Sequence, residues 1–474
     1  MTKENSLETT HHEAKSLLIT GISLIAAMGG LLFGYDTGVM TGVIFILQDD
    51  PNWLLQGSHL GLMVAIALLG CAIGALVGGR LADQRGRRFA LFLSGVLFIA
   101  GSIACAFARD YWFLFGSRLL VGAAIGVTSV ATPLYISELA PAHIRGRLVS
   151  LYQFAIVIGI LAAFLVSWGL EVLPWVTTDE SWRWMFGLGA IPALVLLPGV
   201  MWLPASPRWL VHKGHIDRAR KVLERILHNP RHAHEAIDLV QLSINKEDGG
   251  GGLKTVFGSK FRMALIVGLG LAIFQQLIGI NAVLYYGDLI FKDAGFVEAA
   301  GAFKDEVIVG TVNALFTLIA IWLLDKVGRV PLMLIGLIGM GLSMAALSLA
   351  FLSTNDGADT TALSGWISLI AMCCYVACFA FSMGPIVWVM IAEIFPLKVR
   401  GLAIAVVTAA NWIANLAVSY TFPILKDNLS GGWTFMIYVV MIILTFIFII
   451  IWVPETKGKT LEELEEIWHQ NKKD

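Results

Sequence analysis

Charged residues are scarce in this sequence. Aspartate, glutamate, lysine and arginine make up only 14% of its 474 residues, and the formal net charge is −1. The near balance of charge gives no sign of the basic surface that binds nucleic acid. Hydrophobic residues reach 57% and the mean hydropathy is +0.77, which excludes a soluble multi-domain protein and indicates a chain dissolved mostly in lipid.

Cysteines are few, and they show no pattern. Cys71, Cys105, Cys373, Cys374 and Cys378 all lie in apolar runs, without the spacing of a disulfide framework or a metal site. No set of nucleophile and base stands out either, so we expect no enzyme, no cofactor and no metal site. The first residues also lack the basic start, short apolar core and cleavage site of a signal peptide.

Long apolar runs are abundant instead. Twelve of them have about 18 residues or more, enough to cross a bilayer as a helix. We expect the helices near 17–47, 59–79, 89–108, 111–136, 149–170, 184–203, 263–291, 307–324, 330–352, 365–392, 401–425 and 433–453. The sequence therefore predicts an all-α membrane protein with twelve transmembrane helices.

Basic residues gather in alternate loops. The richer loops hold Arg80, Arg85, Arg87 and Arg88, then Arg145 and Arg147, Lys326 and Arg329, and Lys398 and Arg400. Because cytoplasmic loops carry the excess of lysine and arginine, we expect both termini in the cytoplasm. The longest loop, 204–260, lies on that side and has apolar residues at helical spacing, which predicts short amphipathic helices.

The two halves of the chain repeat each other. Residues 83–87 (DQRGR) return as 325–329 (DKVGR), the Glu138–Gly146 segment returns as Glu393–Gly401, and PASPR at 204–208 matches PETKG at 454–458. Such internal repeats are typical of transporters whose substrate site lies between the halves, near the middle of the membrane.

Two charged residues lie deep in the apolar runs, Asp36 in the first and Arg118 in the fourth. Nearby positive charge favours an ionised carboxylate and burial disfavours it. A carboxylate whose arginine partner moves would bind a proton in one conformation and release it in the other. The alternative is a static ion pair between the two helices. Asp288, near the end of the seventh run, is expected to reach the interface.

Uncharged amide side chains form a second group, concentrated in the second half. They are Gln153, Gln275, Gln276, Asn281, Asn313, Asn411 and Asn415. Amides both donate and accept hydrogen bonds, which suits hydroxyl groups. Amides in membrane helices also bond to neighbouring helices, so a purely structural role stays open.

Aromatic residues could supply apolar walls beside these amides. The candidates are Phe33, Tyr285, Tyr286, Trp388 and Trp412. Trp388 stands out because it follows Gly384 and Pro385, and Pro385 is expected to kink the tenth helix. The Gly122 and Gly126 pair indicates close helix packing.

Charges at the cytoplasmic helix ends occupy mirrored positions in the two halves. They are Asp83, Arg87, Glu138, Arg145, Asp325, Arg329, Glu393 and Arg400. We expect them to pair between the halves and hold the inner side shut; the alternative is solvated loop charge.

In these motifs the sequence resembles the sugar porter family of the major facilitator superfamily. The resemblance covers nearly the whole chain and includes GRLADQRGRR at 79–88, QQLIGIN at 275–281, GPIVW at 384–388 and EIFPLKVRG at 393–401. It implies two six-helix bundles, at 1–203 and 261–456, joined by a cytoplasmic helical linker at 204–260 and followed by a tail at 457–474. It also implies alternating access around a central site.

The resemblance also assigns residues. The sugar contacts of the family fall on Gln153, Gln275, Gln276, Asn281, Asn313, Trp388, Asn411 and Trp412, with Phe33 and Tyr285 nearby. The proton-binding aspartate of proton-coupled members falls on Asp36 and its partner arginine on Arg118. Facilitative glucose carriers typically have asparagine at the position of Asp36, so this residue favours proton coupling.

Three departures from the family pattern bear on function. Ala205 replaces the usual glutamate of PESPR, so one cytoplasmic charge pair is expected to be missing. Ile160 stands where bacterial xylose carriers have a second glutamine, and Asn411 also replaces a glutamine of those carriers. The last two changes favour a hexose such as glucose or galactose over a pentose such as xylose.

These observations predict a proton:monosaccharide symporter, a monomer in the cytoplasmic membrane of a bacterium. Its expected partners are sugar, proton and lipid bilayer. Two alternatives stay open. In one, Asp36 is structural and the protein is a uniporter. In the other, it is a sugar sensor, although the residues after Pro454 are few for a signalling tail.

Overall fold

The structure is a computed structural model. It describes residues 3–48, 50, 53, 57–140, 145–173, 176–227, 230–247, 257–258, 261–294, 299–353, 362–395 and 400–457, some of them inside helices by backbone only. Twelve stretches of helix within these residues are long and apolar enough to cross a membrane, from Ile19–Leu47 to Gly431–Trp452. The predicted all-α fold with twelve spans is confirmed.

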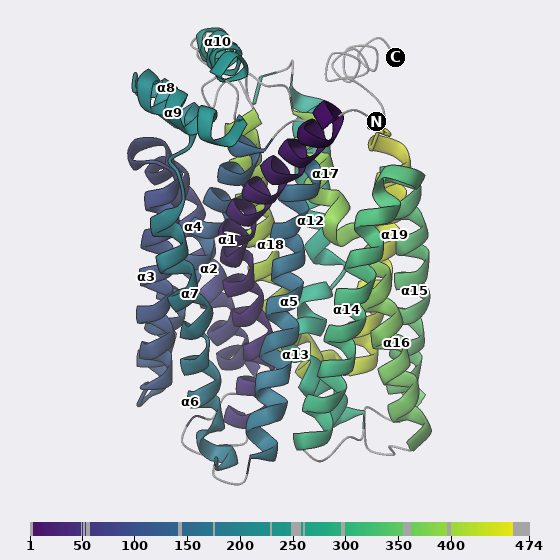
Figure 1. Ribbon diagram of the computed structural model, residues 1–474. Coiled ribbons are helices and arrows are strands. Elements are labelled where there is room, and N and C mark those ends of the chain that lie inside the picture. Colours follow the sequence, from purple (N-terminus) through teal and green to yellow (C-terminus); the bar gives the residue numbers. More distant parts are fainter. Residues whose placement is uncertain are drawn as a thin grey trace.

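Each half of the chain forms one bundle of six spans, side by side in Figure 1. The first half consists of α1 (Lys3–Leu47), α2 (Gly57–Arg85), α3 (Arg87–Ala106), α4 (Tyr111–Leu139), α5 (Arg145–Val172), α6 (Thr178–Leu188) and α7 (Ala190–Trp202). The second consists of α12 (Arg262–Leu277), α13 (Ile280–Asp293), α14 (Ala299–Val327), α15 (Arg329–Ser353), α16 (Ala362–Phe381), α17 (Met383–Ile394), α18 (Arg400–Leu429) and α19 (Gly431–Trp452).

Between the bundles come α8 (Pro207–His212), α9 (Ile216–Leu227) and α10 (Pro230–Glu247), which lie together at one end of the molecule (Figure 1). They pack around Leu210, Val211, Ala219 and Ile237, and leave most of their charged residues exposed. The predicted amphipathic helices are confirmed. We call this end of the bundles the linker end and the opposite end the far end. The four glycines at 249–252, from which the sequence predicts a flexible joint before the seventh span, lie outside the described residues.

Three of the predicted spans are broken helices. The sixth is divided at Gly189, the seventh at Ile278 and Gly279, and the tenth at Ser382. Gly279 has φ +94°, a backbone conformation that favours glycine. Pro385 lies in the first turn of α17, where its missing N–H costs no helical hydrogen bond, so the break falls just before it. The expected irregularity at Pro385 is confirmed as a break.

Small residues bring neighbouring helices into backbone contact. A Cβ atom on Gly122 would lie 1.9 Å from the carbonyl oxygen of Ala67, and one on Gly126 would lie 2.1 Å from that of Cys71. The predicted close packing at these glycines is confirmed, and its partner is α2. The same contact joins α1 to α5, where a Cβ on Gly34 would lie 1.8 Å from the carbonyl oxygen of Ile156.

The bundles also contact each other, in the half of the molecule toward the far end. Thr41 on α1 donates a hydrogen bond to the carbonyl oxygen of Leu284 on α13, at 2.5 Å. On the two flanks, a Cβ on Gly61 would lie 2.5 Å from the carbonyl oxygen of Tyr420, and one on Gly310 would lie 2.8 Å from the Phe164 ring. Backbone and ring approach this closely only where helices are packed together, so the far end is closed.

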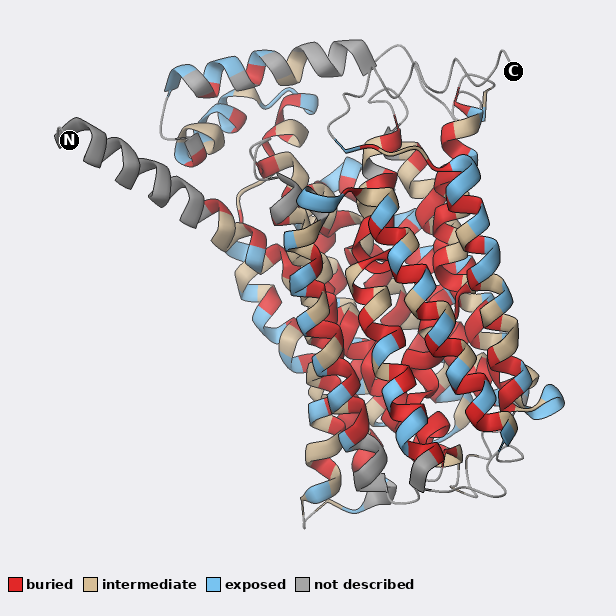
Figure 2. Cartoon of the chain, turned by 90° about the vertical axis from the view of Figure 1, so that its right-hand side faces the viewer, coloured by how far each residue is buried: buried red, intermediate tan, exposed pale blue. Residues whose placement is uncertain are grey.

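Buried residues lie in the interior of the bundles, and exposed residues lie on their outer surface. Buried residues line the inner helix faces in Figure 2, and exposed ones spread over the outer faces. Large apolar side chains such as Trp202, Leu342 and Trp452 are among the exposed ones. An apolar rim of this kind is unfavourable in water and suits a bilayer.

Candidate functional site

The structure brings Asp36 and Arg118 together as a buried ion pair between α1 and α4. The two terminal guanidinium nitrogens of Arg118 each donate to one carboxylate oxygen of Asp36: Nη1 to Oδ1, and Nη2 to Oδ2 at 3.1 Å. Asp36 is 7% exposed and Arg118 is 1% exposed. Two parallel hydrogen bonds make this the strong, geometrically defined form of an arginine–carboxylate pair.

The neighbouring contacts hold this pair in place. Tyr35 donates from its hydroxyl group to the carbonyl oxygen of Met185 on α6, at 2.8 Å, which fixes the rotation of α1. The guanidinium of Arg118 lies over the Phe186 ring, 5.6 Å from its centre, and its Nε finds no hydrogen-bond partner among the residues described. A buried charge with an unused donor is costly, so Arg118 depends strongly on Asp36 for compensation.

Four amides predicted for the sugar site form one hydrogen-bonded network at the breaks of α12–α13 and α16–α17. Gln275 donates to the carbonyl oxygens of Met383 and Gly384, at 2.9 and 3.3 Å, and so bridges the two breaks. Asn411 on α18 donates to Gln275 Oε1 at 3.0 Å and to the carbonyl oxygen of Ala272 at 2.9 Å. Gln276 donates to Asn411 Oδ1 at 3.3 Å and accepts from Asn281.

Beside this network, Trp412 offers an unused donor. Its indole Nε1 is buried and has no hydrogen-bond partner among the described residues. Its ring lies 5.2 Å from that of Phe33, centre to centre and tilted by 59°, so the two aromatics meet across the bundles. A buried N–H without an acceptor is unfavourable and is ready to bond a polar group that enters.

The other predicted sugar contacts are placed on the same helices without a direct bond to the network in the described residues. Tyr285 is buried on α13, within electrostatic reach of Asp36 and Arg118. Asn313 is buried on α14, while Gln153 and Trp388 are half-buried on α5 and α17. Ile160 is buried on α5, where its backbone packs against Gly38 of α1.

The charges at the linker end pair in the same way in both bundles. Glu138 accepts from Arg87, at 2.9 Å, and from Ser206; Glu393 accepts from Arg329, at 3.0 Å, and from Thr456. Asp83 also lies 3.2 Å from Arg87. We expected pairs between the halves; the pairs among the described side chains join helix ends within one bundle. The side chains of Arg145, Asp325 and Arg400 lie outside the described residues.

One contact of the second bundle is not matched in the first, as far as the structure describes the two. Glu455 accepts from the backbone N–H groups of Arg329 and Val330, at 3.1 and 2.9 Å, and so caps the first turn of α15. Burial raises the pKa of the Glu455 carboxyl, but the hydrogen bonds from Lys457, Arg329 and Val330 outweigh it, and the pKa is lowered.

At the matching place in the first bundle, Ala205 lines a cavity of about 250 Å³ beside Gly86, Arg88 and Trp209. The N-cap residue of α3 is Gly86, and among the described residues no side-chain cap is seen there. The charge pair expected to be missing because of Ala205 stays a prediction.

The sequence reasoning missed a pair of buried acids, Asp288 on α13 and Glu306 on α14. Each is 1% exposed, so the expectation that Asp288 reaches the membrane interface is wrong. Glu306 was left outside the eighth span because the apolar run was started at residue 307, whereas α14 begins at Ala299. The apolar residues 299–303 ahead of Lys304 were the available signal.

Comparison with known proteins agrees with this architecture. The family model described as "Sugar (and other) transporter" matches residues 22–468. The D-xylose-proton symporter of Escherichia coli (strain K12) is 38% identical, over 97% of both chains. The glucose transporter GlcP of Staphylococcus epidermidis is 39% identical, over 94% of this chain and 96% of its own.

Solved structures of XylE from E. coli have the same fold. The partially occluded inward-open form superposes with a TM-score of 0.81 at 36% identity, covering 94% of this chain and 99% of XylE. The form bound to 6-bromo-6-deoxy-D-glucose also gives 0.81, at 37% identity, covering 96% and 100%. With these matches over nearly its full length, the chain belongs to the sugar porter family of the major facilitator superfamily and is a multi-pass membrane transporter, not an enzyme.

Proposed function

We propose that the protein is a proton:monosaccharide symporter that works by alternating access, with Asp36 as its proton site and Arg118 as the partner of Asp36. The observation that carries the proposal is the buried, doubly hydrogen-bonded Asp36–Arg118 pair on the helix that also bears Phe33. Ionisable residues at this depth are rarely passive, because each one is costly to bury.

The coupling of proton binding to conformation would follow from whether Arg118 or a proton compensates the charge of Asp36. While Arg118 holds Asp36, the carboxylate is stable without a proton. A movement that separates α1 from α4 would leave Asp36 without its cation in an apolar surrounding, where a bound proton neutralises it. Sugar bound next to Phe33 contacts the same helix, so proton and sugar would favour the same conformation.

The sugar site we propose consists of the amide network, Phe33, Trp412 and the residues around them: Gln153, Ile160, Tyr285, Asn313, Gly384 and Trp388. A sugar hydroxyl group would bond most easily to two donors. One is the free Nε1–H of Trp412, and the other is the side-chain amide of Gln276, whose present hydrogen bonds are long, at 3.3 and 3.4 Å.

For the sugar itself we favour a hexose. Relatives with names for xylose and for glucose are equally similar to this chain, at 38–39% identity, so similarity does not decide. The side chain of Ile160 is buried and apolar. It offers no hydrogen bond where xylose carriers have a glutamine. Because a buried hydrogen-bonding group discriminates strongly between sugars that differ in one hydroxyl contact, the absence of this glutamine is expected to change which sugar binds.

We further propose that the linker end faces the cytoplasm, with both termini on that side, as the basic loops favour. The bundles at 1–203 and 261–456, the linker at 204–260 and the tail at 457–474 would then be the moving and connecting units of a functional monomer. With the far end closed, the conformation would be one that faces or is about to face the cytoplasm.

Uptake by cells or proteoliposomes tests the proposal directly. Labelled glucose, galactose and xylose are supplied with and without an uncoupler, and the pH of a weakly buffered medium is followed. Symport predicts accumulation that the uncoupler abolishes and alkalinisation of the medium on addition of sugar. Sugar entry that equilibrates without any pH change would refute symport.

That second outcome would support a facilitative uniporter. One feature of the structure favours this alternative: the Asp36–Arg118 pair is fully formed, so it can stabilise α1 against α4 without ever titrating. The pH trace decides between the two, because only the symporter takes up a proton with each sugar.

A further inference from the structure

Asp288 and Glu306 form a buried acidic pair that the proposed transport cycle does not use. Both are 1% exposed. Glu306 presses its carboxyl group against the backbone of α13, since Oε1 lies 1.6 Å from where a Cβ on Gly287 would be, next to Asp288. Within the part of the chain that the structure describes, Asp288 Oδ1 and both carboxyl oxygens of Glu306 have no hydrogen-bond partner.

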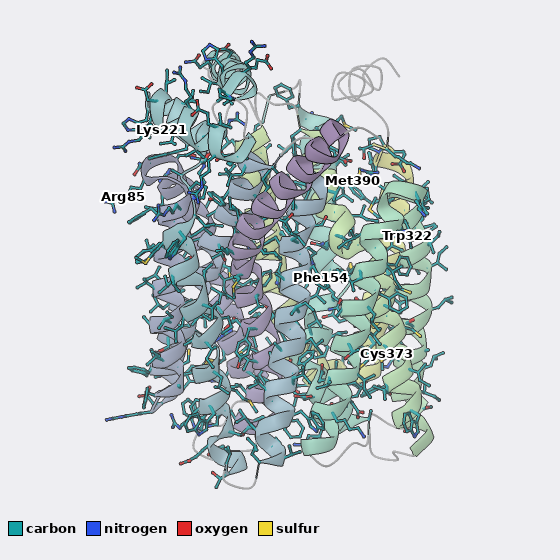
Figure 3. The ribbon with its side chains drawn as sticks, viewed as in Figure 1. Arg85, Phe154, Lys221, Trp322, Cys373 and Met390 are labelled. Carbon is teal, nitrogen blue, oxygen red and sulfur yellow. The ribbon has the colours of Figure 1, made fainter. Side chains whose placement is uncertain are left out.

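No cation among the described residues compensates the pair. Lys292 lies over the Phe45 ring of α1, Lys426 of α18 is paired with Asp293, and Lys304 of α14 is exposed. The other titratable groups that face the pair are Asp305 of α14, beside Lys304, and Cys373 of α16. Cys373 lies in the half of the second bundle toward the far end (Figure 3). The sequence has no lysine or arginine between Lys292 and Lys304.

Two adjacent carboxylates without a cation cannot both stay ionised in such a place. Each charge would lose its hydration and repel the other, and a bound proton removes both penalties. The pair therefore holds at least one proton in this conformation.

The pair also lies on the helix that closes the far end. Leu284 of α13 accepts the hydrogen bond from Thr41 of α1, and Tyr286, between Leu284 and Asp288, leaves helical geometry at φ −121° and ψ 18°. The segment with Asp288 is thus set off by a kink and rests on the other bundle through Lys292 and Phe45. Opening the far end requires this segment to move.

We propose that Asp288 and Glu306 form a second proton-binding site, which keeps its proton while α13 is packed on α1 and loses it to the far side when α13 moves away. The site would make opening of the far end easier at high pH and harder at low pH. It acts beside the proposed function and does not depend on Asp36 being the coupling residue.

Infrared spectroscopy of the full-length protein in lipid tests the bound proton. The wild type should show the C=O stretch of a buried protonated carboxyl, and the Asp288→Asn/Glu306→Gln variant should lose it. Asp36→Asn should keep the band, and so should Asp427→Asn, which removes an exposed carboxylate at the far end. A band unchanged in the double variant would overturn the proposal.

A second measurement tests the link to the gate. With Phe45→Cys in every protein, labelling by a membrane-impermeant maleimide from the far side is followed against pH and corrected for the reactivity of a free thiol. One proton bound to the closed state raises the open fraction by up to about tenfold per pH unit. The double variant should lose this slope; an unchanged slope would refute the coupling.

Two further results would be decisive. If sodium ions at constant pH removed the infrared band, the ligand of the pair would be a metal cation, and the proton assignment would be wrong. If the double variant did not fold, the single variants Glu306→Gln and Asp288→Asn would serve, and at least one of them should weaken the band. If the uptake assay showed no symport, the infrared and labelling measurements would still test the second proton site, because that site does not depend on coupling at Asp36.

Discussion

At the scale of single residues, Asp36 decides between pumping and equilibration. Its carboxylate forms a buried ion pair with Arg118. Asparagine keeps the size of Asp36 but cannot bind a proton, and its amide leaves Arg118 with one acceptor and no countercharge.

We expect Asp36→Asn to abolish accumulation of sugar against its gradient while sugar exchange continues. The concentration ratio across the membrane should fall to about 1, since a carrier without a coupling ion only equilibrates its substrate. Labelled uptake and counterflow in proteoliposomes measure the two activities. Normal accumulation by the variant would contradict the assignment, and the melting temperature shows whether the uncompensated Arg118 has unfolded it.

Trp412 is expected to contribute its indole N–H as well as its ring. Trp412→Phe keeps an aromatic wall beside Phe33 but removes the donor. Loss of one hydrogen bond to an uncharged hydroxyl, worth about 0.5–1.5 kcal/mol, should raise the Kd for sugar about 2- to 12-fold. Equilibrium binding measures this, with Trp366→Phe, an exposed tryptophan, as the control. Unchanged affinity would exclude the N–H as a ligand.

Glu455 should make stability depend on pH. Its pKa is lowered by the helix cap on α15, so its contribution is fully present above the pKa of an unfolded glutamate and is lost as pH falls through the lower folded value. Glu455→Gln should therefore melt at a lower temperature than the wild type at pH 7, and its free energy of unfolding should fall by about 1 kcal/mol or less, since the cap is only half-buried. The difference should shrink below about pH 4. A constant difference at all pH values would point to lost packing instead.

At the scale of helices, the number of spans and their approximate positions could be predicted, because a bilayer demands long apolar runs. The break at Gly189 could not be predicted, since it depends on what packs around it, whereas Pro385 indicated the irregularity of the tenth span that falls at Ser382. The early start of α14 could not be predicted, because Lys304, Asp305 and Glu306 are three consecutive charged residues, which indicate a loop. Only the structure shows that Glu306 is buried within the helix.

The candidate site was predictable to a similar degree. The pairing of Asp36 with Arg118 follows from two lone opposite charges, and their contact in the structure agrees with it. Which amides share hydrogen bonds, and that Trp412 keeps a free donor, depends on side-chain geometry that no spacing encodes. The burial of Asp288 was not predicted, because its partner Glu306 comes from another helix.

The contact of α1 with α5 positions Asp36, and it depends on Gly34. A Cβ at Gly34 would overlap the carbonyl oxygen of Ile156, a backbone atom that cannot move aside. Gly34→Ala should destabilise the protein by about 1–3 kcal/mol or more and impair transport. Gly21 lies on the same helix with nothing within 4 Å of its Cβ position, so Gly21→Ala should be neutral. Equal melting temperatures for both variants would contradict this packing.

At the scale of the whole molecule, the two bundles are in contact toward the far end, and the ion pairs seen among the described residues of the linker end lie within one bundle. The ion pairs of Glu138 with Arg87 and of Glu393 with Arg329 can stay intact while the bundles rock, because neither crosses the interface. They would then stiffen each bundle as a rigid body, and the latch would be the packing at the far end.

A reversible covalent lock at the far end tests this view. Gly310 of α14 faces Phe164 of α5, with only 2.8 Å between a Cβ on Gly310 and the ring. Replacing both residues by cysteine makes room and places two thiols across the interface, within reach of a disulfide or a short crosslinker. Oxidation should stop uptake almost completely, and reduction should restore it.

The single variants Gly310→Cys and Phe164→Cys control for the substitutions themselves and should be insensitive to oxidant. Sugar should still bind the locked protein from the linker end, which inside-out vesicles can show. Because alternating access requires the far end to separate once in every cycle, a fully crosslinked protein that still transported sugar would mean that the contacts between α5 and α14 never open.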